Sequence, residues 1–161
     1  MKKKVLDLIY KTHSQGVEKS IFMRDFILKH DRANFYDDIY DTLEFFYKHI
    51  PIHFAYEEVV INTLLKGNNL TKDEISLMDR ILGEHKTLIM NFEKIKELAA
   101  KIEKVKNHEL KEDFMEIVNE TIYSLIKHAE LEDERLYPLI EAKADGSLLV
   151  VVEKEISRII I

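Results

Sequence analysis

The 161-residue sequence has no cysteine, no tryptophan, only four glycines and two prolines, and a formal net charge of −6. Without cysteine there can be no disulfide, thiolate site or iron–sulfur cluster, so any metal must be held by imidazole and carboxylate groups. No apolar stretch reaches the roughly 20 residues of a membrane span. The negative charge argues against nucleic acid as a partner. We therefore expect a soluble, cytoplasmic protein with neither a membrane nor a nucleic-acid partner.

Apolar residues recur at helical spacing along nearly the whole chain. With 46% hydrophobic and 34% charged residues, this pattern predicts a single all-α domain over residues 1–161. Cap and stop signals divide the chain into four helices of roughly 30 residues, and short connections make neighbouring helices antiparallel. We predict an up-down-up-down four-helix bundle over about residues 3–144.

The helix boundaries are predicted from capping and stop signals. These signals lie in residues 31–34, in residues 66–69, in the capping-box pair Thr71 and Glu74, and at Asn107. The first helix is expected to run from about Lys3 to His30. The fourth is expected to begin at about Asn107 and to run through His128 to about Lys143.

The tail, residues 147–161, is rich in β-branched residues and could form a strand. However, Leu148, Val152 and Ile156 also fit one face of a helix, and we expect a short C-terminal extra helix. Its apolar face needs cover, either from the end of the bundle or from a second subunit. A homodimer through this tail is therefore one of two alternatives.

One pattern, a single histidine followed by His-x-x-x-Glu, occurs twice. Its residues are His13, His53 with Glu57, His85, and His128 with Glu132. A histidine and a glutamate four residues apart lie on one helix face, so each pair can offer a nitrogen and an oxygen to a shared metal. Two such pairs and two single histidines suit a dinuclear site. Because roughly 0.8 His-x-x-x-Glu matches are expected by chance in this sequence, the motif alone does not establish a metal site.

The depth of each histidine in the bundle separates the candidates. Each residue advances about 1.5 Å along its helix, so residues equally far from a turn lie at one height. The four histidines of the pattern fall in one layer, whereas His30 and His108 lie beside turns, on the order of 25–30 Å away. Burying this layer without a cation would cost several kcal/mol. The predicted metal ligands are His13, His53, Glu57, His85, His128 and Glu132.

Three neighbouring residues stay open as further ligands. His49 shares a helix face with Glu57 but lies about 12 Å from it, which favours a role in orienting a ligand. Glu58 and Asp133 each follow a histidine by five residues. We favour Glu132 over Asp133 because a residue at +4 lies ~40° from its histidine on an ideal helix and a residue at +5 lies ~140° away.

The ordered series of histidines and glutamates, ending in Leu136, Tyr137 and Pro138, resembles the hemerythrin-like, or HHE cation-binding, domain. The resemblance covers the chain to about Glu141. It implies a non-haem di-iron centre of two Fe ions, with the four histidines as terminal ligands and both glutamates bridging. Zn or Mn would suit the same donors.

The resemblance also implies that the centre binds dioxygen or a related small diatomic ligand. Oxygen-carrying hemerythrins have two histidines one turn apart on the third helix, whereas Ile81 and Ile89 flank His85 here. One nitrogen ligand of the carriers is therefore missing. We expect oxygen binding or sensing. The alternatives are a redox enzyme acting on peroxide or nitric oxide, and an iron-homeostasis protein, so whether the chain is an enzyme stays open.

Overall fold

The computed structural model describes residues 2–29, 35–67, 69–105 and 107–159. Their elements are α1 (Lys2–Lys29), α2 (Phe35–Lys66), α3 (Lys72–Val105), α4 (His108–Leu131), the π-helical turn η2 (Glu132–Leu136), α5 (Tyr137–Lys143) and α6 (Gly146–Ile159). These described ranges contain no strand, so the all-α prediction is confirmed. None of the described helices is long and apolar enough to cross a membrane.

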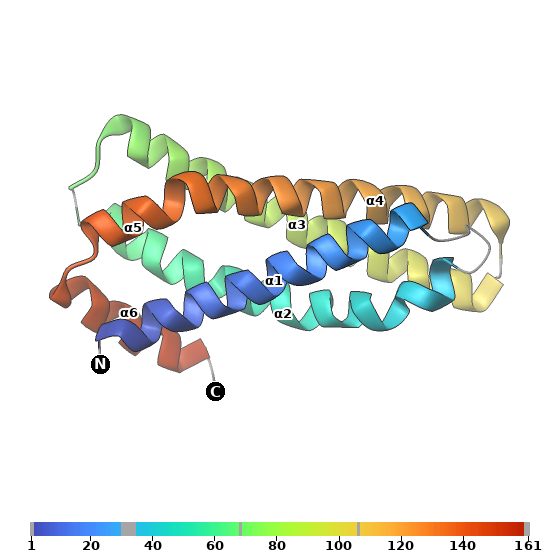
Figure 1. Ribbon diagram of the computed structural model, residues 1–161, viewed down its shortest axis with the longest axis horizontal. Helices are drawn as coiled ribbons and strands as arrows, with labels where there is room; N and C mark the ends of the chain where they lie inside the picture. The colour runs from blue at the N-terminus through green and yellow to red at the C-terminus, as the bar shows by residue number, and fades with distance from the viewer. Residues whose placement is uncertain (1, 30–34, 68, 106, 160–161) are drawn as a thin grey trace.

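Four long helical rods lie side by side along the long axis of the molecule (Figure 1). The fourth rod is continuous through α4, η2 and α5. The rods α1 and α3 each pack against both α2 and the α4 rod. Figure 1 also shows that α1 ends and α2 begins at one end of the molecule, whereas α2 ends and α3 begins at the other.

Hydrogen bonds confirm two of the predicted helix starts. Thr71 N donates to Glu74 Oε1 at 3.0 Å and Glu74 N donates to Thr71 Oγ1 at 3.2 Å, which is the reciprocal capping box. At the start of α4, Glu109 N donates to Asn107 Oδ1 at 2.9 Å. The helix α2 ends at Lys66, beside the predicted stop signal. The predictions that fall on residues 30–34 and 68 lie outside the described residues.

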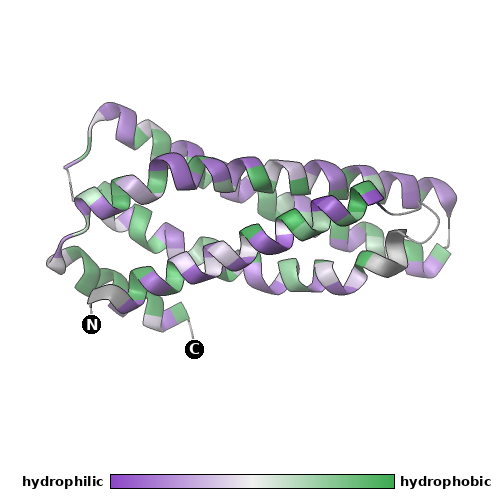
Figure 2. Cartoon of the chain, viewed as in Figure 1, coloured by the Kyte–Doolittle hydropathy of each residue, from purple (hydrophilic) through white to green (hydrophobic). Residues whose placement is uncertain are grey.

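The core consists of two clusters of buried apolar side chains with a polar layer between them. One cluster includes Met23, Phe46 and Leu125, and the other includes Ile9 and Leu136. Figure 2 shows hydrophobic and hydrophilic residues alternating along each helix, as expected for helices with one buried face. On every long rod, the histidines of the predicted site lie where one cluster ends and the other begins.

The C-terminal helix α6 packs on α2 and α1. Its residues Val152 and Ile156 are buried against the bundle, while Val150 and Val151 are exposed. The predicted extra helix is therefore confirmed for Gly146–Ile159, and the chain's own bundle covers its apolar face. The homodimer through this tail stays a prediction.

Candidate metal centre

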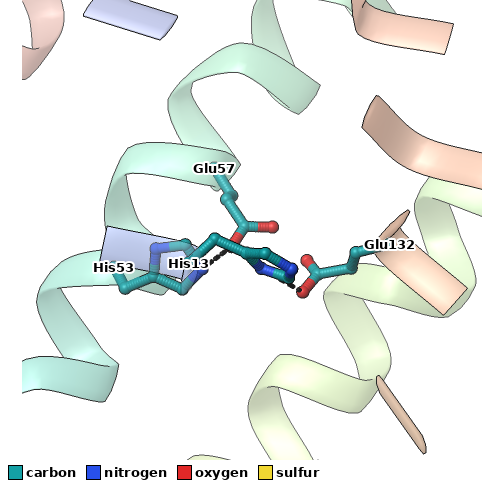
Figure 3. A group of neighbouring side chains, drawn as sticks. All are labelled: His13, His53, Glu57 and Glu132. Carbon is teal, nitrogen blue, oxygen red and sulfur yellow. Dashed lines mark ion pairs between the residues drawn. The ribbon is translucent and has the colours of Figure 1, made fainter. Parts of the chain in front are cut away.

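The six predicted ligand side chains come together in the interior. All are buried, with exposed fractions of at most 7%. Their donor atoms form two groups, within each of which all atoms lie within 4.8 Å of one another: His13, His53, Glu57 and Glu132 in the first, and His85, His128 and Glu132 in the second. Figure 3 shows the side chains of the first group pointing toward one another. Glu132 belongs to both groups, so the arrangement could hold two ions that share one carboxylate.

Several buried atoms of this layer face one another without hydrogen bonds of regular geometry. His85 Nε2 lies 3.6 Å from Glu132 Oε2, and His128 Nε2 lies 3.3 Å from Glu132 Oε1, yet neither nitrogen has a hydrogen-bond partner among the described residues. His53 Nε2 faces Glu57 Oε1 in the same way. Unpaired buried polar atoms are costly. Because all of them can ligate a cation, the residues fit a metal centre.

Carboxylates hold the outward nitrogens of two histidines. Glu58 Oε1 lies 3.0 Å from His85 Nδ1, and Glu84 Oε1 lies 3.1 Å from His128 Nδ1. Because a carboxylate only accepts, each Nδ1 carries the ring proton and each Nε2 directs its lone pair to the centre. Such outer partners fix the orientation of a metal-binding imidazole and raise its basicity.

The other two histidines are oriented in different ways. Thr12 Oγ1 donates to the carbonyl of Ile9 at 3.0 Å, so it accepts from His53 Nδ1, which is 2.7 Å away. His13 is reversed, because its Nε2 donates to Asp133 Oδ1 at 2.9 Å and its Nδ1 lies 3.7 Å from a Glu132 oxygen. All four imidazoles therefore present one lone pair to the same interior layer.

The two buried carboxylates differ in protonation. Burial raises the pKa of Glu57, but interactions with His53 and Glu132 outweigh it and the pKa is lowered. Burial raises the pKa of Glu132 well above its usual range, and the charge of Glu57 raises it further. The two shifts are opposite because two buried carboxylates in contact do not readily carry a charge each. Burial, with the neighbouring His85, lowers the pKa of His128 to about 4, which keeps this imidazole neutral and available to a metal.

The fourth rod is helical to Lys143, as predicted, but it changes helix type at the centre. From Glu132 to Leu136 it forms a π-helical turn, in which Tyr137 N donates to the carbonyl of Glu132. On an ideal α-helix, Tyr137 would lie about 180° from His128. The extra residue in the π turn brings Tyr137 back to the buried side, where it is 7% exposed. Such turns are frequent at functional sites.

The residues left open by the sequence lie outside both donor groups. His49 Nε2 donates to a backbone carbonyl of α1 at 2.8 Å. Glu58 and Asp133 each hold the far nitrogen of a histidine. The His108 side chain is 87% exposed, far from the buried layer, and His30 lies outside the described residues. Of the two neighbouring acids, Glu132 lies in the buried layer and Asp133 does not.

Two contacts of the centre were not predicted from the sequence. Thr12 precedes His13 but binds His53, and Glu84 precedes His85 but binds His128. Each side chain serves an imidazole on another helix. No spacing within a single helix signals such a contact.

Glu84→Ala is expected to weaken metal binding about 10- to 100-fold, because it leaves the buried Nδ1 proton of His128 without an acceptor. Competition with a chromophoric chelator measures the change. The matched control is Glu93→Ala, which removes an exposed glutamate from the same helix. Equal weakening by both variants would contradict a specific role for Glu84.

A helical bundle with a buried layer of four histidines and two glutamates defines a metal-binding helical protein. The family comparison agrees, since a family model described as the hemerythrin HHE cation binding domain matches residues 5–140. The chain therefore belongs to the hemerythrin HHE cation-binding domain family, as the resemblance predicted. No curated protein and no solved structure matches the sequence. The family match ends before α6 begins.

Proposed function

We propose that the protein is a non-haem di-iron protein whose buried centre binds dioxygen or another small diatomic molecule. The observation that carries the proposal is the convergence of four imidazole lone pairs and two carboxylates in one buried layer. Two donor groups with one shared carboxylate suit a pair of ions. When bound, a pair of iron ions supplies redox electrons and open coordination positions for a small ligand.

In this proposal each side chain has a separate role. His13 and His53 would hold one ion and His85 and His128 the other, and Glu132 and Glu57 would be the carboxylates that the two ions share. Two properties of Glu57 suit it to this role: its side chain is fully buried, and its lowered pKa keeps the carboxylate ionised. Zn or Mn would suit the same donors.

The surrounding chain excludes water from the layer. Phe54 stacks on the His85 ring at a centroid distance of 3.9 Å, and its own side chain is 2% exposed. The apolar clusters close the layer along the bundle axis in both directions. We propose that an up-down-up-down four-helix bundle over about residues 3–144, within a single domain, provides this enclosure. A dry site protects a bound reactive ligand from side reactions.

The test is anaerobic loading with Fe(II), metal analysis and an absorption spectrum before and after exposure to air. We expect about two irons per chain and a new absorption band on exposure. Reversal of the band on degassing indicates oxygen binding, whereas irreversible change with turnover of peroxide or nitric oxide indicates the redox enzyme. Iron loading without any spectral response to oxygen or nitric oxide would contradict the proposal.

A further inference from the structure

The hydroxyl of Tyr137 is a buried proton donor that lies beside Glu57 but makes no hydrogen bond of regular geometry to it. Its side chain is 7% exposed, and the hydroxyl makes no hydrogen bond of regular geometry to any described residue. Buried tyrosine hydroxyls usually find a partner. A buried hydroxyl without a regular partner, beside a candidate metal centre, is therefore available to a ligand of that centre.

Two aromatic neighbours fix the Tyr137 ring. It meets the His13 ring edge to face at a centroid distance of 4.7 Å, and the Tyr10 ring at 5.2 Å. The Tyr10 hydroxyl donates to Glu141 at the surface, at 3.3 Å. The two neighbouring tyrosines therefore differ, since the Tyr10 hydroxyl has an exposed acceptor and the Tyr137 hydroxyl is enclosed with the centre.

The chemistry of the layer makes this hydroxyl distinctive. The neighbouring buried atoms are imidazole lone pairs and carboxylate oxygens, which accept hydrogen bonds or ligate cations. Burial raises the pKa of Tyr137, and the negative charge of Glu57 raises it further, so the hydroxyl keeps its proton at neutral pH. Thr121 also has a buried hydroxyl without a described partner, but it lies about 10 Å along α4 from His128.

We propose that Tyr137 donates a hydrogen bond to a small anionic ligand held at the centre. The inference rests on the proposed function, because a metal ion must hold the anion among carboxylates that would otherwise repel it. Glu57 and Glu132 offer such an anion no donor, and the Tyr137 hydroxyl does. The proton stays on Tyr137 throughout, so the residue binds and orients the ligand without transferring a group.

The test is a titration of the iron-loaded protein with azide, a small anion, followed by its absorption band. In Tyr137→Phe the azide affinity is expected to fall roughly tenfold, as for the loss of one hydrogen bond to a charged group. The vibrational frequency of the bound azide should shift as well. The matched control is Tyr10→Phe, which also removes one hydroxyl and keeps the ring, and it should bind azide as the wild type does. Iron content and thermal midpoint are recorded for each protein.

The outcomes separate this inference from the proposed function. An iron-loaded Tyr137→Phe variant with wild-type azide affinity and an unchanged azide vibration would overturn the inference alone. Loss of iron from Tyr137→Phe would also overturn it, because the hydroxyl would then position a metal ligand such as Glu57. If the wild-type protein takes up no iron, the proposed function is wrong and this inference falls with it.

Discussion

The Glu132→Gln variant should lose both metal ions and keep the fold. Among the described residues, Glu132 alone belongs to both donor groups. Glutamine has nearly the same size, but its amide oxygen is neutral and cannot bridge two cations as a carboxylate does. Elemental analysis should show a fall from about two ions per chain to well below one.

The fold should survive because the raised pKa of Glu132 favours its neutral form in the metal-free protein. Burial and the charge of Glu57 raise the pKa of Glu132 well above its usual range, and glutamine mimics the protonated acid. The thermal midpoints of the metal-free variant and the metal-free wild type should lie within a few degrees, and only the wild type should gain stability when metal is added.

The matched control for this variant is Glu134→Gln, which changes an exposed glutamate two residues further along the same turn. It should keep the full metal content. Retention of one tightly bound ion by Glu132→Gln would mean that the two donor groups are independent. That result would contradict the shared role of this carboxylate.

The meeting of the six donors in one layer was predictable because long helices have a constant rise. Counting residues from each turn gave a height for every histidine, and turn signals such as the Thr71 capping box fixed the origin of the count. The same reasoning placed His108 outside the layer, and its side chain is 87% exposed. In this bundle, the height of a residue along the axis can be predicted from the number of residues that separate it from the nearest turn.

The direction in which each side chain of the fourth rod points around the helix axis was harder to predict. An ideal α-helix places Glu132 on the buried face and Asp133 on the exposed face, as the structure does, because the helix is still regular from His128 to Leu131. Beyond that point the π turn changes the register. Pro138 follows the turn and signals an irregular helix, but it does not show that the turn gains a residue, so the burial of Tyr137 beside His13 could not be predicted.

Side-chain contacts between helices could not be predicted from the sequence. Whether Glu84 binds the imidazole of its neighbour or that of His128 depends on how α3 and α4 are rotated against each other. The same holds for Thr12 and His53 on α1 and α2. These contacts fix which nitrogen faces inward, so the electronic character of the site comes from tertiary packing.

The metal-free protein should lose stability on acidification, because burial holds the pKa of His128 at about 4 in the folded state. An unfolded chain would bind this proton near the ordinary value of about 6.5. Between those two values the unfolded state carries more protons, so the free energy of unfolding falls as the pH falls. For His128, which is 1% exposed, the loss is about 3 kcal/mol. The lowered pKa of His13, also caused by burial, acts in the same direction.

Glu132 acts in the opposite direction over part of this range. Its raised pKa means that the folded state keeps a proton that the unfolded chain releases near pH 4.5, so its contribution to stability falls as the pH rises. The two effects partly cancel in the wild type. In Glu132→Gln the opposing contribution is gone, and the free energy of unfolding should rise more steeply between about pH 4.5 and 6.5. Urea unfolding of both chelator-treated proteins across this range measures the slopes, and parallel profiles would show that Glu132 does not hold a proton in the metal-free fold.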